Sequence, residues 1–179
     1  MKKKNVIVLE WDDDPEPSST TAYLQFHTAS PGYILVDNLN RLYGLSLARI
    51  DDIDHNGTPW PLYTYHDSLR RLRYFLVETT PAENSEEKLL LLLGENAPNI
   101  AETIYNDLTH PAPVQPGDLL AAEHQTLRQE LLSDFTLVTR LDFSSTPSKP
   151  AARRRSAELQ HRCEDILEYI ERHRLDLGA

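Results

Sequence analysis

The dipeptide Asn56–Gly57 lies between two segments, residues 45–53 and 60–65, in which apolar and polar side chains alternate. Alternation with a period of two is typical of a half-buried strand. Asn-Gly is favoured in two-residue hairpin loops because a type I′ turn needs positive φ angles at both central positions. The two segments are therefore predicted to form a β-hairpin, so the fold must contain an antiparallel or mixed sheet.

The residues around this turn also match the start of a calcium-binding loop. Asp52, Asp54, Asn56 and Gly57 follow the D-x-[DN]-x-[DN]-G spacing of an EF-hand. An EF-hand also needs a bidentate Glu at loop position twelve and a helix on each side, whereas position twelve is Tyr63 and both flanking segments have strand periodicity. We interpret the segment as a hairpin tip. Its three carboxylates within four residues leave open a hard-cation site of another kind.

Further segments rich in β-branched and aromatic residues predict additional strands. They follow the hairpin without long helical patterns between them, which indicates strands paired with their sequence neighbours. We expect an α+β fold, with an antiparallel or mixed sheet of about five to six strands, helices packed on one face, and a C-terminal amphipathic helix. The predicted strands are residues 5–11, 21–29, 45–53, 60–67, 72–79, 88–93 and 134–143.

Four segments carry apolar residues at helical spacing. Gly44 fits the left-handed C-cap of the first segment, and Asp118 fits the N-cap of the third. The predicted helices cover about residues 31–43, 98–108, 119–132 and 156–177. We divide the chain into an α+β domain at residues 1–143, a linker at 144–155 and the C-terminal helix at 156–177.

Composition excludes several classes of partner. The formal net charge of −10 argues against nucleic acid, because such binding depends on neutralising phosphates with Lys and Arg. The single cysteine, Cys163, excludes an intramolecular disulfide and fits a reducing compartment. The apolar run at residues 6–9 is shorter than the roughly 7–15 residues of a signal peptide, and no later run approaches the ~20 residues that span a bilayer. We expect a cytoplasmic protein without a membrane or nucleic-acid partner.

Familiar catalytic motifs are missing. The sequence has no G-x-S-x-G, no P-loop and no G-x-G-x-x-G, and its histidines lack zinc-site spacing. We therefore assign no catalytic residue and no cofactor. A small-molecule or metal-binding site would have to form where His66–Asp67 lies beside Asp54–His55 across the hairpin, because no other arrangement of these residue types converges. Its candidate residues are Asp52, Asp54, His55, His66 and Asp67, with Tyr63 or Tyr65 on the strand.

The C-terminal helix carries an apolar stripe that could pack on its own domain, pair with a second copy or enter a groove of a partner. Together with the missing catalytic motifs, this stripe favours a non-enzymatic protein that acts through protein–protein contacts, with a protein partner or as a homodimer. An alternative is an acidic mimic that binds a basic partner, since residues 12–17 are strongly acidic. The stripe consists of Leu159, Cys163, Ile166, Leu167 and Ile170.

The middle of the chain resembles a known family. The strings YILVDNLNRLYGLSLARIDDID, WPLYTYHD and LRYFLVET are similar to the core of the IPExxxVDY family of small Bacteroidetes proteins, and SDFTLVTRLDF is similar to its last strand. The family's I-P-E…V-D-Y string has no counterpart here, and residues 86–95 stand in its place. The resemblance implies a bacterial, cytoplasmic protein of uncharacterised function, and it supplies no site residues.

Overall fold

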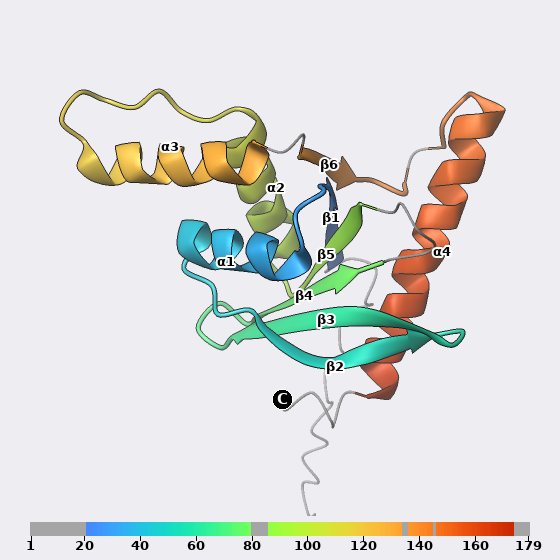
Figure 1. Cartoon of the computed structure of the whole chain (residues 1–179). Helices are drawn as coiled ribbons and strands as arrows, with labels where there is room; N and C mark the ends of the chain where they lie inside the picture. Colours follow the sequence, from blue (N-terminus) through green and yellow to red (C-terminus); the bar gives the residue numbers. More distant parts are fainter. Residues whose placement is uncertain (1–20, 80–85, 134–135, 145, 174–179) are drawn as a thin grey trace, which may run out of the picture.

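A computed structural model describes residues 21–79, 86–133, 136–144 and 146–173. Within these residues the chain forms one six-stranded sheet and four helices (Figure 1). The strand predicted at residues 5–11 and the acidic run at 12–17 lie outside them. The strands are β1 Thr21–His27, β2 Ala48–His55, β3 Thr58–Asp67, β4 Leu72–Glu78, β5 Glu87–Leu93 and β6 Leu137–Leu141. The helices are α1 Gly32–Tyr43, α2 Ala97–Thr109, α3 Leu119–Leu132 and α4 Pro150–Arg172.

The strands lie in the order β2-β3-β4-β5-β1-β6, and each neighbouring pair is antiparallel. Strands β2 to β5 form a meander, as expected for strands that follow one another without an intervening helix. β1 pairs with the far side of β5, and β6 completes the sheet beside β1. The predicted α+β class with an antiparallel sheet is confirmed.

The β2–β3 turn has the predicted geometry. Asn56 has φ 52° and Gly57 has φ 83°, both in the left-handed region that a type I′ turn requires. His55 pairs directly with Thr58, so the loop has two residues. Gly44 also has a left-handed backbone conformation, with φ 63°, and it forms the predicted C-cap of α1. The acidic segment is thus a hairpin tip rather than a calcium loop.

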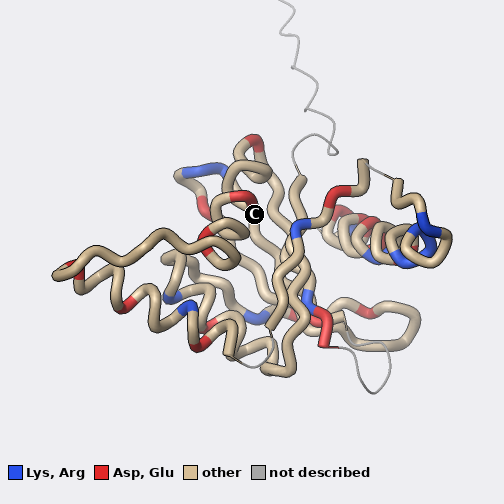
Figure 2. The backbone as a smooth tube through the Cα atoms, turned by 90° about the horizontal axis from the view of Figure 1, so that it is seen from above, with Lys and Arg blue, Asp and Glu red and all other residues tan. Residues whose placement is uncertain are grey.

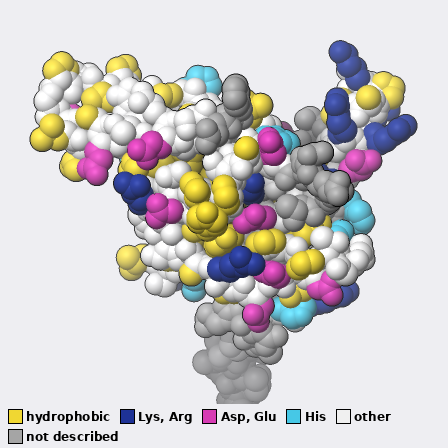
Figure 3. All heavy atoms as spheres, in the orientation of Figure 1, with side chains coloured by type: hydrophobic (Ala, Val, Ile, Leu, Met, Phe, Trp, Pro, Cys, Tyr) yellow, Lys and Arg dark blue, Asp and Glu magenta, His cyan; other side chains and the backbone are white. Residues whose placement is uncertain are grey.

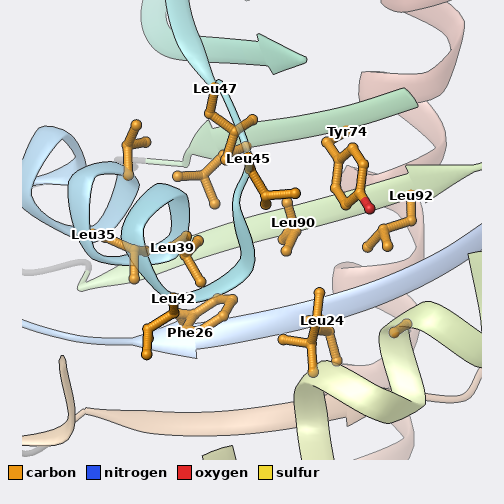
Figure 4. Close-up of a cluster of buried hydrophobic side chains, with 14 of the residues drawn as sticks. Leu24, Phe26, Leu35, Leu39, Leu42, Leu45, Leu47, Tyr74, Leu90 and Leu92 are labelled. Carbon is orange, nitrogen blue, oxygen red and sulfur yellow. The ribbon is translucent and has the colours of Figure 1, made fainter. Parts of the chain in front are cut away.

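One face of the sheet is covered by α1, α2 and α3. Figure 4 shows Leu24 and Phe26 of β1 and Leu90 of β5 on the same side of the sheet as Leu39 of α1. These four side chains are fully buried. Because Cβ atoms alternate across a strand, the neighbours of these residues in β1 and β5 point to the opposite face of the sheet.

That opposite face is covered by α4. Leu89 and Leu91 of β5 lie in a second apolar cluster with Ile166 of α4, whereas Leu90 and Leu92 lie in the first. β5 therefore needs apolar side chains in both directions, which explains why its sequence shows no alternation. The sequence predicted a separate C-terminal helix but not the face on which it packs.

α4 begins at Pro150 rather than at residue 156, so the linker predicted at residues 144–155 is too long. Proline suits the first turn of a helix, and the Ala and Arg residues that follow are good helix formers. Basic residues follow one another at this N-terminal end, which is coloured blue at the far right of Figure 2. None of the helices in the described part of the chain combines the length and apolar character needed to cross a bilayer.

Candidate functional site

The two residue pairs predicted to converge at the hairpin lie at opposite ends of β3. The short turn places His55 opposite Thr58, at the beginning of the strand. His66 and Asp67 are the last residues of the same strand. His66 lies eight positions after Thr58, which corresponds to about 27 Å along an extended chain. The predicted cluster of Asp54–His55 with His66–Asp67 is therefore wrong.

The aspartates at the tip serve the hairpin itself. Asp54 Oδ1 accepts the backbone N–H of Gly57 at 2.8 Å and so stabilises the turn. Asp52 Oδ1 forms an ion pair with Arg49 Nη2 at 2.9 Å. Within the described ranges, no group of three or more His, Cys, Asp or Glu side chains is arranged to hold a metal ion.

Asp67 has a similar local role at the other end of β3. Its Oδ1 accepts the backbone N–H groups of Leu69 and Arg70 at 3.2 and 3.1 Å, and thereby closes the β3–β4 turn. Tyr63 and Tyr65 pack against the core beneath α1, on the face of the sheet opposite α4. Neither tyrosine joins a site with His55.

The structure instead brings His55 to α4. His55 Nε2 lies 3.1 Å from Asp165 Oδ2, and the ring stacks on Trp60 with centroids 4.0 Å apart and an interplanar angle of 13°. A carboxylate only accepts hydrogen bonds, so the Nε2–H of His55 donates and Nδ1 is the acceptor in the neutral ring. Asp165 lies 110 positions after His55, and no motif spacing links the two.

A second stacked pair, Tyr169 with His173, stands beside the first. Their ring centroids are 4.1 Å apart, and His173 Nδ1 donates to the carbonyl oxygen of Tyr169 at 2.9 Å. Together with Asp54, Asp165 and Glu168, the two pairs line an open cleft of about 470 Å³ between the hairpin tip and the C-terminal half of α4.

A histidine oriented by an aspartate can act as a general base. Among the described residues that line this cleft there is no Ser, Thr or Cys, and the only hydroxyl is the phenol of Tyr169. Among the described lining residues, three carboxylates and one guanidinium, that of Arg172, give the cleft an acidic balance. Its chemistry suits binding of a small cationic ligand better than covalent catalysis.

The apolar stripe of α4 faces its own sheet. Cys163, Ile166 and Ile170 are buried in the second cluster, and Leu159 and Leu167 pack at its margin. The stripe predicted as an interaction surface is therefore covered by the chain's own strands.

A partly buried ion pair fixes the same helix to β5. Arg162 Nη2 lies 2.9 Å from Glu87 Oε2, and its Nε donates to Oε1 at 3.1 Å. Burial alone would raise the pKa of Glu87, but hydrogen bonds from Thr79, Arg162 and Gln25 outweigh it and hold the pKa below its ordinary value.

The helices on the other face contain a second polar network. Asp107 of α2 accepts hydrogen bonds from Tyr43 of α1 at 2.9 Å and from His124 and Arg128 of α3 at 3.1 and 2.6 Å. Burial opposes ionisation of Asp107, but these three donors leave its pKa below the ordinary value. One carboxylate therefore ties three helices together.

Next to this network the loop before α3 and the first turn of that helix form a projecting arm, which we define as residues 110–123. The arm extends away from the body at the left of Figures 1 and 2. Leu119 and Leu120, in the first turn of α3, are 82% and 80% exposed. Figure 3 shows hydrophobic side chains at the outer end of this arm. The sequence predicted the helix and its Asp118 cap, but it gave no sign that these leucines are uncovered.

No family model matches this chain, and no curated protein or solved structure shows significant similarity to it.

Proposed function

We propose that the protein is a non-enzymatic interaction domain that binds another protein through the tip of its projecting arm. The observation that supports this proposal is the pair of adjacent leucines, Leu119 and Leu120, which are about four-fifths exposed. Single exposed apolar residues are ordinary on protein surfaces, whereas a group at the end of a projection is a common feature of contact sites.

The arm is built to present these leucines. Asp118 Oδ1 accepts the backbone N–H of Ala121 at 3.0 Å, which caps the helix where the leucines begin. The described contacts that anchor α3 to the body begin at His124, which bonds to Asp107, and continue through Leu127, Arg128 and Leu131. Covering two leucines by a partner would contribute about 3–6 kcal/mol, on the usual scale for burial of such side chains.

The test is affinity capture of partners from extracts of the source organism, followed by titration of purified captured protein against the arm variants. We expect Leu119→Ser combined with Leu120→Ser to weaken the measured affinity at least about tenfold, because the buried apolar area is lost. Leu69→Ser is the matched control, since Leu69 is 96% exposed on the distant β3–β4 turn. Equal binding by the arm variant and the wild type would overturn the proposal.

A second candidate function is the binding of a small organic cation in the cleft beside His55. Its support is the coincidence of the oriented His55–Asp165 pair, the stacked aromatic rings and an excess of carboxylates in one cavity. Aromatic rings and carboxylates are the groups that recognise ammonium compounds in proteins.

This candidate is tested by thermal-shift and calorimetric screening of a panel of primary and quaternary amines. Binding should be lost in Asp165→Asn and kept in the distant charge variant Asp37→Asn, on the exposed face of α1. If no amine raises the melting temperature of the wild type, or if Asp165→Asn binds equally well, the cleft is not such a site.

A further inference from the structure

Strand β6 ends the sheet with an outer edge that pairs with no strand in the described part of the chain. An unpaired edge presents a row of backbone donors and acceptors to which another strand can add. Natural proteins usually protect such edges with charges, proline, bulges or a covering element.

The two edges of this sheet differ in that protection. β2, at the opposite end, carries Arg49, Asp51, Asp52 and Asp54, and its register is interrupted between Ile50 and Ile53. β6 pairs with β1 in an unbroken register, contains no proline, and has one charged residue, Arg140. The guanidinium of Arg140 lies 3.7 Å from Glu102 of α2, so its charge is already compensated. Among the described residues, the short length of β6 is the main feature that protects this edge.

Two of the three β6 side chains on the α4 side of the sheet are exposed. Leu137, Thr139 and Leu141 share this side, because the residues between them point to the opposite face. Leu141 packs at the margin of the α4 cluster, but Leu137 is 67% exposed and Thr139 is exposed too. A strand added outside β6 would cover both.

We propose that this edge pairs with the same edge of a second copy of the chain, in an antiparallel arrangement centred on Thr139. A two-fold axis at Thr139 places Leu137 opposite the partner copy's Leu141 and Thr139 opposite itself. Both are favourable cross-strand pairs. Arg140 then faces Val138, so no like charges lie directly opposite one another. The register is therefore self-complementary, as an isologous two-fold interface requires.

This surface is separate from the projecting arm, so the proposal stands or falls independently of the function assigned to the arm. Leu119 and Leu120 lie in the first turn of α3, whereas β6 is anchored beside β1. The arm variants should therefore leave dimerisation unchanged, and the β6 variants should leave partner binding by the arm unchanged.

The experiment is sedimentation-velocity analysis of the full chain over a concentration series. We expect a reversible monomer–dimer equilibrium for the wild type. Thr139→Lys should raise the dissociation constant about tenfold or more, because it places two ammonium groups opposite each other. Ala48→Lys, at an exposed position of the β2 edge, is the matched control and should leave the equilibrium unchanged.

A charge swap tests the register directly. Thr139→Lys and Thr139→Glu should each be monomeric alone and should form a heterodimer when mixed, because position 139 faces itself. Thermal unfolding of each variant shows that it remains folded. A wild type that stays monomeric at high concentration, a Thr139→Lys variant that dimerises normally, or a mixture that fails to restore the dimer would each overturn the proposal.

Discussion

The imidazole of His55 donates to the carboxylate of Asp165 at 3.1 Å, and this contact joins the tip of the first hairpin to the last helix. His55 also stacks on Trp60, which lies in the core beneath α4. One side chain therefore covers a buried ring and binds the helix that seals the same face.

We predict that His55→Ala lowers the free energy of unfolding by about 1–2 kcal/mol, because it removes one hydrogen bond and one ring contact. Urea denaturation followed by circular dichroism measures the change. His161→Ala is the matched control. His161 lies 3.9 Å from the same carboxylate and its side chain is 74% exposed, so the expected change is within about 0.5 kcal/mol. Equal losses in the two variants would contradict the prediction.

The thiol of Cys163 reports whether α4 stays on the sheet. Burial raises the pKa of Cys163 to about 12, and the reactive thiolate is therefore scarce in the folded protein. We predict that iodoacetamide labels the native protein at least about a thousandfold more slowly than the unfolded protein at the same pH. Cys163→Ala combined with Glu164→Cys places a thiol on the exposed side of α4 and should react quickly. Rapid labelling of native Cys163 would show that the helix detaches.

Removing one partner of the Glu87–Arg162 pair should lower the free energy of unfolding more than replacing both partners. Glu87→Gln leaves a partly buried guanidinium without its counter-ion, and we expect a loss of about 3 kcal/mol in the free energy of unfolding. Replacing both partners, as Glu87→Leu with Arg162→Met, should recover part of that loss because neither charge of the pair remains buried, while Gln25 and Thr79 lose the carboxylate that accepts from them. Chemical denaturation of the single and double variants decides between the outcomes. A double variant no more stable than Glu87→Gln would refute this account.

Stability should fall on acidification through Glu87 and Asp107. Both carboxyls have a pKa below the ordinary value in the folded chain, so folding favours their ionised forms. The resulting stability is fully present above the unfolded-state pKa of about 4 and is lost as the pH falls through the folded-state pKa. Melting temperatures measured from pH 7 to 3 should decline less steeply below pH ~4 for Asp107→Asn than for the wild type. Parallel curves would show that Asp107 contributes nothing to this dependence.

Two glycines with positive φ should respond differently to alanine. A Cβ at Gly94, with φ 146°, would lie 2.5 Å from the backbone carbonyl oxygen of Arg71, whereas a Cβ at Gly117, with φ 86°, would meet nothing within 4 Å. We expect Gly117→Ala to cost about 1 kcal/mol in backbone strain and Gly94→Ala to cost clearly more, because a backbone atom must also move. Thermal unfolding of both variants provides the comparison, and equal costs would argue against the close approach at Gly94.

Local signals in the sequence predicted much of the fold. The Asn56–Gly57 turn, the Gly44 cap and the Asp118 cap depend on a few adjacent residues, and the structure contains all three. The apolar run of β5 indicated a buried strand, but it did not indicate that helices cover both faces of that strand. That information lies in the packing of elements far apart in the chain.

The residues of the candidate site were harder to predict from local sequence signals. Asp54 and His55 do lie at the hairpin tip, but the length of β3 carries His66 away from them. Asp165 approaches His55 only because α4 crosses the sheet at a particular angle, and no spacing in the sequence encodes an angle. The exposure of Leu119 likewise follows from where α3 leaves the body, which its helical periodicity does not specify.

α4 comes after every strand that it covers in the sequence, and this order has a consequence for the newly made chain. Every strand that it covers leaves the ribosome before it does, so Trp60, Phe75 and Leu91 have no helix above them while synthesis continues. During that interval the growing chain exposes an apolar face of the sheet, to which chaperones can bind and which can drive aggregation. A chain that stops before Pro150 would keep this liability permanently, and it should accumulate in inclusion bodies rather than as a smaller folded domain.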